Sequence, residues 1–219
     1  KLSLLAPLHN PANLAGIKAC KKIAPKTPQV AVFDTAFYEK LEEKVYLYGL
    51  PYDLYAKNNI RKYGFHGTSH QYVIESAKKI LRKKNPKIIS CHIGNGSSIT
   101  AYNGTHAVEN SMGLTPLEGI IMGTRSGSID PSIIFYLSKN LKMKTDKIED
   151  LLNHESGLKG LSKISSDMRD LYAESKKGNK MAKLAIEILS YQIAKTISSF
   201  LPILNGLDAI VFTGGLAEK

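Results

Sequence analysis

Residues 92–113 read HIGNGSSITAYNGTHAVENSMG, and their pattern decides the kind of sheet that the chain forms. An apolar run, KIISCHIG, leads into this stretch and breaks at residues 94–98. Alternating residues resume in SITAY, and the pair Asn103-Gly104 separates them from THAVENS. Asn-Gly between alternating segments indicates a β-hairpin, because both central residues of a type I′ turn need a positive φ. The stretch therefore predicts consecutive strands joined by two tight turns.

The first turn, at residues 94–98, has a second interpretation. Gly94 and Gly96 leave consecutive backbone N–H groups accessible, and Ser97 and Ser98 add two hydroxyls, as an anion-binding concavity needs. An ordinary hairpin turn explains the same residues more simply. The choice between a phosphate site and a plain turn depends on the rest of the chain.

Length and composition limit the class of protein. The chain has 219 residues, of which 43% are hydrophobic, so it can bury the core of a large domain. No apolar run approaches the roughly 18 residues that span a bilayer, and the start, KLSLLAPLHNP, has no signal-peptide pattern. Cys20 and Cys91 lie far apart, which indicates reduced thiols rather than a disulfide. We expect a cytoplasmic protein, and the absent initiator Met suggests a fragment.

The net charge of +11 raises the question of nucleic-acid binding. The lysines fall on the polar faces of expected helices, and the one dense cluster, LRKKNPK, has no interleaved aromatic residues to stack on bases. A solvated basic surface is the better interpretation, and it would favour small anionic ligands.

Strand and helix patterns alternate along the chain. Helices are expected at residues 10–23, 70–83, 131–141, 147–156, 167–178 and 179–204, and strands at residues 29–37, 87–94, 98–102, 105–111 and 208–216. Residues 45–67, 112–132 and 157–166 are expected to be irregular. The last strand ends at Gly214 and Gly215, which is typical of an α/β unit whose backbone meets a ligand at the carboxyl end of a strand. We therefore predict an α/β fold with a β-hairpin sheet.

Two candidate chemical groups precede the quoted stretch. Asp34 follows the apolar run VAVF, where a carboxylate can hold Mg²⁺ through water or orient a reacting group. A helix-capping or turn aspartate is the equal alternative. His66 lies in RKYGFHGTSH, just ahead of a helix that Thr68 or Ser69 could cap, and it could donate to a developing negative charge. A core histidine with satisfied hydrogen bonds is the usual explanation for such a residue.

Two further candidates follow the quoted stretch. Arg125 lies in GTRSGSIDP, where its fork of donors suits a phosphate or a carboxylate, although a loop-bracing salt bridge explains it as well. Asp167 and Arg169, in SSDMRD, could grip a ribose or a base. Asp167 is just as plausible as the N-cap of a helix.

Eight segments together resemble the acetate kinase family in their order along the chain. They are LAPLHNPAN, VAVFDTAF, YGFHGTSH, HIGNGSS, MGLTPLEG, MGTRSGSIDP, SGLKGLSKISSDMRD and FTGGLAEK. The segments are long and chemically specific, and they run from Leu5 to about Glu218. In this light, residues 92–98 resemble the family's phosphate- and adenosine-binding hairpin.

The resemblance implies an architecture and a setting. The fold would be α/β, a ribonuclease H-like (actin-like ATPase) domain with a mixed sheet flanked by helices, as a fragment of a two-domain kinase. Residues 1–34 would form the end of the N-terminal domain, and residues 35–219 most of the C-terminal nucleotide-binding domain, whose C-terminal part is missing. The family resemblance further implies a homodimer that binds neither nucleic acid nor membrane.

The resemblance also implies roles for residues by their place in the motifs. The implied catalytic residues are Asp34, His66 and Arg125, and the implied acetate-side residues are His9 and Phe65. The implied nucleotide-binding residues are His92, Ile93, Gly94, Asn95, Gly96, Asp167, Met168, Arg169, Gly215, Leu216, Ala217, Glu218 and Lys219. The family's metal ligands have no counterpart in this chain.

The implied reaction is reversible phosphoryl transfer between ATP and acetate, with Mg²⁺ or Mn²⁺ as cofactor and acetyl phosphate and ADP as products. Propionate or butyrate as the acceptor is the alternative within the enzyme class. A nucleotide-binding module of the Hsp70 or actin type, without a small substrate, is a second alternative. A basic nucleic-acid binder is the third, and it would show affinity that falls steeply with salt.

Overall fold

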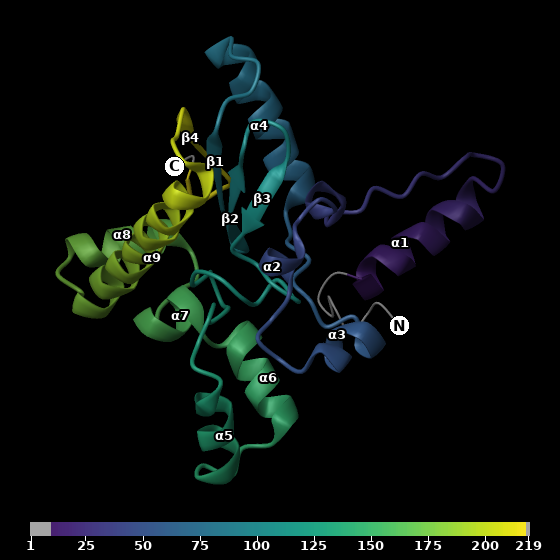
Figure 1. Ribbon diagram of the computed structural model, residues 1–219. Coiled ribbons are helices and arrows are strands. Elements are labelled where there is room, and N and C mark those ends of the chain that lie inside the picture. The colour runs from purple at the N-terminus through teal and green to yellow at the C-terminus, as the bar shows by residue number, and fades with distance from the viewer. Residues whose placement is uncertain (1–9, 218–219) are drawn as a thin grey trace.

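A computed structural model describes residues 10–217 as helices around one four-stranded sheet (Figure 1). The strands are β1 (Ile88–Ile93), β2 (Ser97–Tyr102), β3 (Ala107–Asn110) and β4 (Ala209–Thr213). Their order across the sheet is β3-β2-β1-β4. The first three strands pair antiparallel, and β4 pairs parallel with β1. The sheet is therefore mixed, and its three antiparallel strands are those that the sequence predicts.

The helices surround this sheet. They are α1 (Asn10–Ile23), α2 (Glu43–Tyr46), α3 (Tyr52–Asn58), α4 (Gly67–Leu81), α5 (Ser132–Lys139), α6 (Thr145–His154), α7 (Gly157–Ser162), α8 (Met168–Lys176) and α9 (Lys180–Leu204), with a 3-10 helix at Ala36–Tyr38. Within the described range, no helix is long and apolar enough to cross a membrane.

Helices cover both faces of the sheet, and alternation along β1 assigns residues to the two sides. Ile89 and Cys91 belong to the largest buried cluster, which includes side chains of α8 and α9. Ile88 points the other way and packs with Ile74 and Ala77 of α4. Because side chains of a strand alternate between faces, Ser90 and His92 also face α4. A mixed sheet flanked by helices is the predicted fold class, which is confirmed.

The long helix α9 carries the chain to β4. Its N-cap is Asn179, whose side-chain oxygen accepts from the N–H groups of Met181 and Ala182, and it ends at Asn205 with φ of 47°. Both ends agree with the predicted helix. Because β4 runs parallel to β1, the carboxyl ends of these two strands meet at one edge of the sheet.

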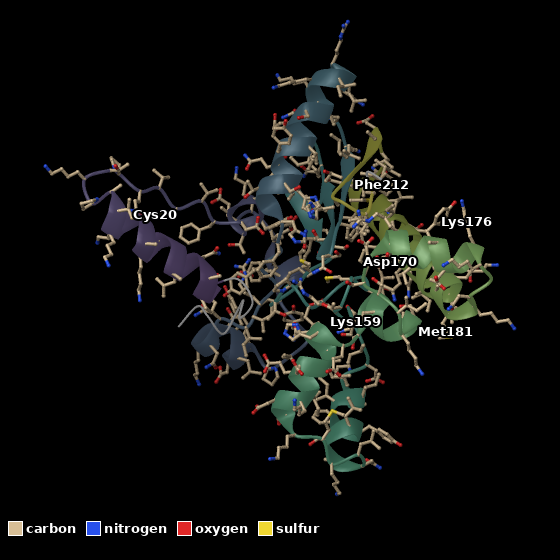
Figure 2. All side chains as sticks on the ribbon, turned by 180° about the vertical axis from the view of Figure 1, so that it is seen from behind. Cys20, Lys159, Asp170, Lys176, Met181 and Phe212 are labelled. Atoms are coloured by element: carbon tan, nitrogen blue, oxygen red, sulfur yellow. The ribbon has the colours of Figure 1, made fainter. Side chains whose placement is uncertain are left out.

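The predicted strand at residues 29–37 is wrong. Residues 29–33 have no regular structure, and Val30 and Val32 are 87% and 77% exposed. An apolar run becomes a strand only where a neighbouring strand accepts its hydrogen bonds, and the described sheet has none beside this segment. Figures 1 and 2 show α1, which carries Cys20, standing away from the sheet at the end of this segment.

Three local predictions also need correction. The segments expected to be irregular contain the short helices α3 and α7 and the last two residues of α2. Helix α4 begins at Gly67, so neither Thr68 nor Ser69 is its cap. The Asn103-Gly104 turn is not type I′, because only Gly104 has a positive φ, of 99°. Instead, the side-chain oxygen of Asn103 accepts from the N–H groups of Thr105 and His106, which closes a longer loop.

Candidate active site

The carboxylate of Asp34 fixes the start of α4. Its Oδ2 accepts from the backbone N–H of His66 at 2.5 Å, and its Oδ1 accepts from the N–H and hydroxyl of Thr68 at 3.3 and 3.4 Å. The backbone carbonyl of Asp34 accepts from the N–H of Gly67. A carboxylate at a helix N-terminus satisfies donors that the helix leaves unpaired and interacts favourably with its dipole. Asp34 therefore supports the start of α4 at His66, 32 residues further along the chain, and does not cap the segment that directly follows it, where Thr35 is the N-cap.

His66 lies directly before α4 in a left-handed backbone conformation, with φ of 57°. Such a conformation is uncommon for a residue other than glycine and needs support from its surroundings. The hydrogen bond from its N–H to Asp34 provides that support. The ring of His66 contacts the ring of His92, from the end of β1, with 4.3 Å between the centroids and 34° between the ring planes.

A second buried histidine lies behind these two rings. His70, one turn into α4, is fully buried, and its Nδ1 and Nε2 contact the hydroxyls of Ser90 and Ser98 at 2.9 and 2.7 Å. Burial, and then the nearby histidines, hold the pKa of His70 well below 6.5. His70 is therefore a neutral imidazole.

Arg125 is buried in the loop between β3 and α5. It is 7% exposed, and its Nη1 donates to the carbonyl of Pro116 at 3.1 Å. Across residues 10–217 no carboxylate pairs with it, so a loop-bracing salt bridge is not what holds it. Burial lowers the pKa of its guanidinium below the ordinary value of an arginine. A buried cation without a counter-ion is costly, which indicates a place where an anion binds.

Gly96, in the turn between β1 and β2, brings Arg125 and His66 together. A Cβ added at Gly96 would lie 3.2 Å from Nη1 of Arg125 and 3.3 Å from Nε2 of His66. Gly123 approaches the same turn, since its N–H donates to the carbonyl of Asn95 at 3.1 Å. The loop that carries Arg125 is thus packed on the turn, where Arg125 and His66 approach each other, and Asp34 is linked to this place through the backbone of His66.

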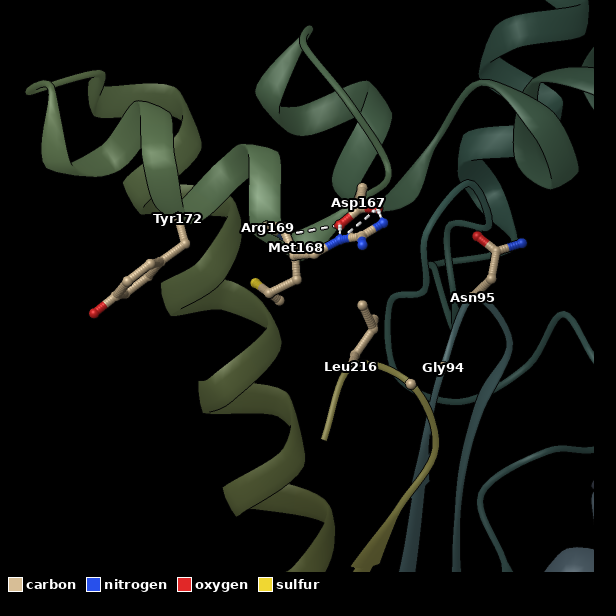
Figure 3. A pocket seen from close by; sticks show the side chains of 8 residues that line it. Gly94, Asn95, Asp167, Met168, Arg169, Tyr172 and Leu216 are labelled. Atoms are coloured by element: carbon tan, nitrogen blue, oxygen red, sulfur yellow. Dashed lines mark hydrogen bonds and ion pairs between the residues drawn. The ribbon is translucent and has the colours of Figure 1, made fainter. Parts of the chain in front are cut away.

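A pocket of about 780 Å³ opens beside this turn (Figure 3). Its lining residues are Gly94, Asn95, Asp167, Met168, Arg169, Tyr172, Gly215 and Leu216. All but Tyr172 are residues that the sequence predicts to bind a nucleotide. Tyr172 stands one helical turn after Met168 on α8, so the helical period contained the signal that would have found it.

Asp167 and Arg169 form an ion pair at the N-terminus of α8. Asp167 is the N-cap, and its Oδ1 accepts from the N–H of Arg169 at 2.9 Å. The guanidinium of Arg169 folds back onto the same carboxylate, with Nε 3.0 Å from Oδ1 (Figure 3). Asp167 is therefore both a helix cap and a residue of the pocket.

Of the two glycines after β4, Gly214 has no room for a side chain, whereas Gly215 does. Gly214 has φ of 93°, and a Cβ there would lie 2.6 Å from the carbonyl oxygen of Ile93. Gly215 has open space around it and lines the pocket. The N–H of Leu216 then donates to the carbonyl of Ile93 at 2.9 Å, which ties the end of β4 to the end of β1.

Other predicted residues lie at the edges of this arrangement. Ile93 points into the core, and His92 contacts the hydroxyl of Ser69 at 2.9 Å. The carbonyl of Phe65 accepts from the hydroxyl of Tyr38 at 2.8 Å. The N–H of Ala217 donates to the carbonyl of Gly214. His9, Glu218 and Lys219 lie outside the described residues.

The residues present do not form a protein cage for a metal ion. Groups of three or more His, Cys, Asp or Glu side chains placed to hold one are absent from residues 10–217. Asp34 offers a carboxylate near His66, but both of its oxygens already accept hydrogen bonds. Mg²⁺ is often held mainly by substrate phosphates and water, so the described residues supply at most a minor part of its shell.

Comparisons with known proteins agree with this geometry. The model of the acetokinase family matches residues 1–219. An acetate kinase of Clostridium botulinum is 52% identical over 217 residues, which are 98% of this chain and 55% of that protein. The crystal structure of a propionate kinase from Francisella tularensis has a TM-score of 0.97 at 51% identity, over 100% of this chain and 56% of that chain. An acetate kinase structure from Porphyromonas gingivalis has a TM-score of 0.94 at 45% identity, over 100% of this chain and 55% of that one.

The chain spans about half the length of the curated relatives it matches. Over that span, the chain matches the family's sequence model and shares the fold of solved kinases. The chain therefore belongs to the acetokinase family.

Proposed function

We propose that the full-length enzyme containing this chain transfers the γ-phosphoryl group of ATP to acetate, giving acetyl phosphate and ADP, and catalyses the reverse reaction as well. One observation carries the proposal. Arg125 is a buried cation without a carboxylate partner in the described part of the chain, and its Nη1 and the Nε2 of His66 both face Gly96. This is an arrangement of donors for an anion at the turn.

Phosphoryl transfer suits such an arrangement. Its transition state is loose and metaphosphate-like, so an enzyme contributes mainly alignment and stabilisation of charge on the equatorial oxygens. Arg125 and His66 would donate to these oxygens from fixed positions. One acetate oxygen forms a bond to phosphorus as the bond from phosphorus to the bridging oxygen of ADP breaks.

The acceptor needs no general base. A carboxylate such as acetate has a pKa near that of Glu, about 4.3, so it is ionised at neutral pH. Asp34 therefore has no proton to remove. Its contacts with the N–H groups of His66 and Thr68 support a positioning role, in which it holds the donor histidine in place.

The nucleotide would occupy the pocket beside the turn. Gly94 and Asn95 would bring backbone N–H groups to its phosphates, and Asp167, Arg169 and Gly215 would surround its nucleoside. Bound Mg²⁺ would add charge stabilisation at the phosphates, chiefly through oxygens of the nucleotide itself.

Propionate is a second candidate acceptor. The propionate kinase from Francisella tularensis is 51% identical to this chain and has a TM-score of 0.97 with it. One additional methylene is worth only about 1–3 kcal/mol in an apolar pocket, so small changes in lining decide between the two acids. Comparison of kcat/KM for acetate, propionate and butyrate would separate these acceptors.

We also propose the setting of the enzyme. Residues 1–34 would end an N-terminal domain and residues 35–219 would form most of a nucleotide-binding domain, since none of residues 10–37 is buried and the core begins at Tyr38. The free thiols Cys20 and Cys91 are consistent with a cytoplasmic location. A homodimer without affinity for nucleic acid or membrane is proposed from the family resemblance and the dispersed lysines.

The experiment is a hydroxylamine-trapping assay for acetyl phosphate with the full-length enzyme, acetate and MgATP. Arg125→Ala should lower kcat by roughly two to four orders of magnitude, because it removes a charged donor to the transition state, with a smaller change in nucleotide KM. Arg61→Ala is the matched control, since Arg61 stacks 3.6 Å above the ring of Tyr46, and its loss should affect stability alone. An Arg125→Ala effect confined to KM would contradict the proposed role.

A further inference from the structure

Three buried side chains behind His66 have no part in the proposed chemistry. They are Ser90 on β1, Ser98 on β2 and His70 on α4, and each is 0% exposed. They form a continuous chain of contacts with His66. The hydroxyl of Ser98 lies 2.9 Å from Nδ1 of His66 and 2.7 Å from Nε2 of His70, and the hydroxyl of Ser90 lies 2.9 Å from Nδ1 of His70.

The number of hydrogens limits how this chain can be arranged. A serine hydroxyl has one hydrogen, so Ser98 can donate to only one of the two rings and must accept from the other. A neutral imidazole carries one N–H, and His70 is neutral because it is buried. The contacts therefore allow two arrangements, which run in opposite directions along the chain from Ser90 to His66.

Ser90 decides the direction. Within residues 10–217, Nδ1 of His70 is the one side-chain partner of its hydroxyl, and Ser90 is fully buried. If His70 donated from Nδ1, the hydrogen of Ser90 would be left without an acceptor, at a cost of about 1–3 kcal/mol. Ser90 therefore donates to Nδ1 of His70, and His70 carries its hydrogen on Nε2.

The rest of the chain follows from this start. His70 donates from Nε2 to Ser98, and Ser98 uses its only hydrogen to donate to Nδ1 of His66. Nδ1 of His66 is then an acceptor, so the hydrogen of its neutral ring is on Nε2. That nitrogen is the one that lies beside Gly96 and Arg125.

We propose that Ser98 and His70 are positioning residues which hold His66 in the Nε2–H form, so that it presents a neutral donor to the transferred phosphoryl group. The inference rests on the proposed function for its last step only. The hydrogen-bond chain itself depends on the described contacts and on the single hydrogen of each hydroxyl.

The chain of contacts also disfavours a hydrogen on Nδ1 of His66. A hydrogen on Nδ1 would meet the hydrogen of Ser98, which would lose its acceptor. Among residues 10–217, the titratable or charged side chains near His66 are His70, His92 and Arg125, together with the carboxylate of Asp34, which accepts from the backbone N–H of His66. Arg125 would supply the positive charge at this site, and His66 a directed neutral hydrogen bond.

The direct test is the tautomer of His66 in the full-length enzyme. Labelling of histidines with ¹⁵N and two-bond ¹H–¹⁵N correlation spectra at pH 8 distinguish the two ring nitrogens, and the spectrum of His66→Gln identifies the signals of His66. We expect a protonated Nε2 and an unprotonated Nδ1. A ring with its hydrogen on Nδ1 would overturn the proposal, whether or not the enzyme makes acetyl phosphate.

Variants of Ser98 test the link to catalysis. Ser98→Ala should lower kcat about 10- to 100-fold, with a change in nucleotide KM below about threefold, and should give His66 signals of a mixed tautomer. Ser98→Thr keeps the hydroxyl and should restore most of kcat. Ser111→Ala is the matched control, because it removes a hydroxyl that accepts from Ile99 on the same strand without contact to a histidine.

The outcomes separate the two proposals. An unchanged kcat and an unchanged His66 spectrum in Ser98→Ala would overturn the positioning role. If Ser98→Ala does not fold, the wild-type spectrum still decides the tautomer. A wild-type enzyme that shows the Nε2–H form but makes no acyl phosphate would refute the proposed function and leave the hydrogen-bond chain standing.

Discussion

The carboxylate of Asp34 accepts a hydrogen bond from the backbone N–H of His66, 32 residues further along the chain. The same aspartate also accepts from the N–H groups of Gly67 and Thr68, so it binds three successive residues at the start of α4. His66 has φ of 57°, and these bonds hold it there. Asp34 thus determines where the imidazole of His66 points, although the two side chains need not touch.

Replacement of Asp34 should therefore reduce both stability and turnover. We expect Asp34→Ala to destabilise the full-length enzyme by about 1–2 kcal/mol, through loss of the acceptor at the start of α4. It should also lower kcat by at least about tenfold, because His66 is no longer fixed. Asp34→Asn retains an acceptor oxygen and should lie between wild type and Asp34→Ala. Denaturant unfolding and the trapping assay measure the two effects.

Asp53→Ala is the control for the charge of Asp34. Asp53 forms an exposed ion pair with Lys57 on α3, in which 70% and 71% of the two side chains are accessible. Its substitution should therefore change neither the unfolding free energy nor kcat. A kcat for Asp34→Ala equal to that of wild type would show that the position of His66 does not depend on Asp34.

Gly96→Ala tests the convergence at the turn. The added Cβ would lie 3.2 Å from Nη1 of Arg125 and 3.3 Å from Nε2 of His66, so both donors would have to shift. We expect kcat to fall by up to about tenfold, since the donors must shift by a few tenths of an ångström and a misplacement of about 1 Å costs about 100-fold. Stability should change little, because Gly96 is not among the glycines with a positive φ.

Gly49→Ala is the matched control for this substitution. A Cβ at Gly49 would meet nothing within 4 Å, and Gly49 is also not among the residues with a positive φ. Its activity should equal that of wild type. Full activity in Gly96→Ala would mean that His66 and Arg125 do not act at the turn.

The sequence predicts well those elements that are determined by residues within or next to the element itself. Asn179 and Asp167 cap helices through their own side chains, and the apolar period of α9 extends over its whole length. The prediction of a strand at residues 29–37 is wrong because a strand requires a neighbouring strand, and the sequence of the segment does not reveal whether one is present. The predicted type I′ turn at Asn103 is wrong because the type of turn depends on the register of β2 with β3. That register shifts between Ala101 and Tyr102.

The residues of the candidate site also fall into those that the sequence reveals and those that depend on packing. The turn at residues 94–96 and the loop around Arg125 are visible as glycine-rich motifs with polar residues. His70 was not singled out, although it stands four residues after His66, because a buried histidine in a helix has no distinctive pattern. Its role depends on the rotation of α4 and on the pairing of His92 with Ser98 across β1 and β2. Such information arises only from packing.

Cys91 should be a protected thiol, in contrast to Cys20. Burial raises the pKa of Cys91 to about 12, whereas Cys20 is exposed. At pH 8 a thiol reagent should therefore modify Cys20 within minutes and Cys91 only on unfolding. A Cys20→Ser variant that still reacts rapidly in its native state would contradict the burial of Cys91.

The same shift predicts a pH dependence of stability. The folded state holds the proton of Cys91 more tightly than the unfolded state, whose thiol has its ordinary pKa of 9.0. The contribution of Cys91 to stability is therefore fully present below about pH 9 and is lost as pH rises from 9 towards 12. Cys91→Ala should flatten the decline in unfolding free energy over this range relative to wild type, and an equal decline in both would contradict it.

The two roles of Asp167 can be separated by substitution. Asn is as good an N-cap as Asp, so Asp167→Asn should leave the unfolding free energy within about 0.5 kcal/mol of wild type. It removes the charge that holds the guanidinium of Arg169, which lies at 2.5 Å from the carboxylate. Because Arg169 lines the pocket, its loss of orientation should raise the nucleotide KM several-fold and leave kcat nearly unchanged.

Asp167→Ala and Asn179→Ala complete this experiment. Asp167→Ala should show the same rise in KM and, in addition, lose about 1 kcal/mol of stability because α8 loses its cap. Asn179 caps α9 by accepting from Met181 and Ala182, and it does not line the pocket. Asn179→Ala should therefore lose a similar stability with no change in KM. If KM rises in Asp167→Ala but stays at the wild-type value in Asp167→Asn, the cap orders the pocket, and the ion pair with Arg169 has no part in binding.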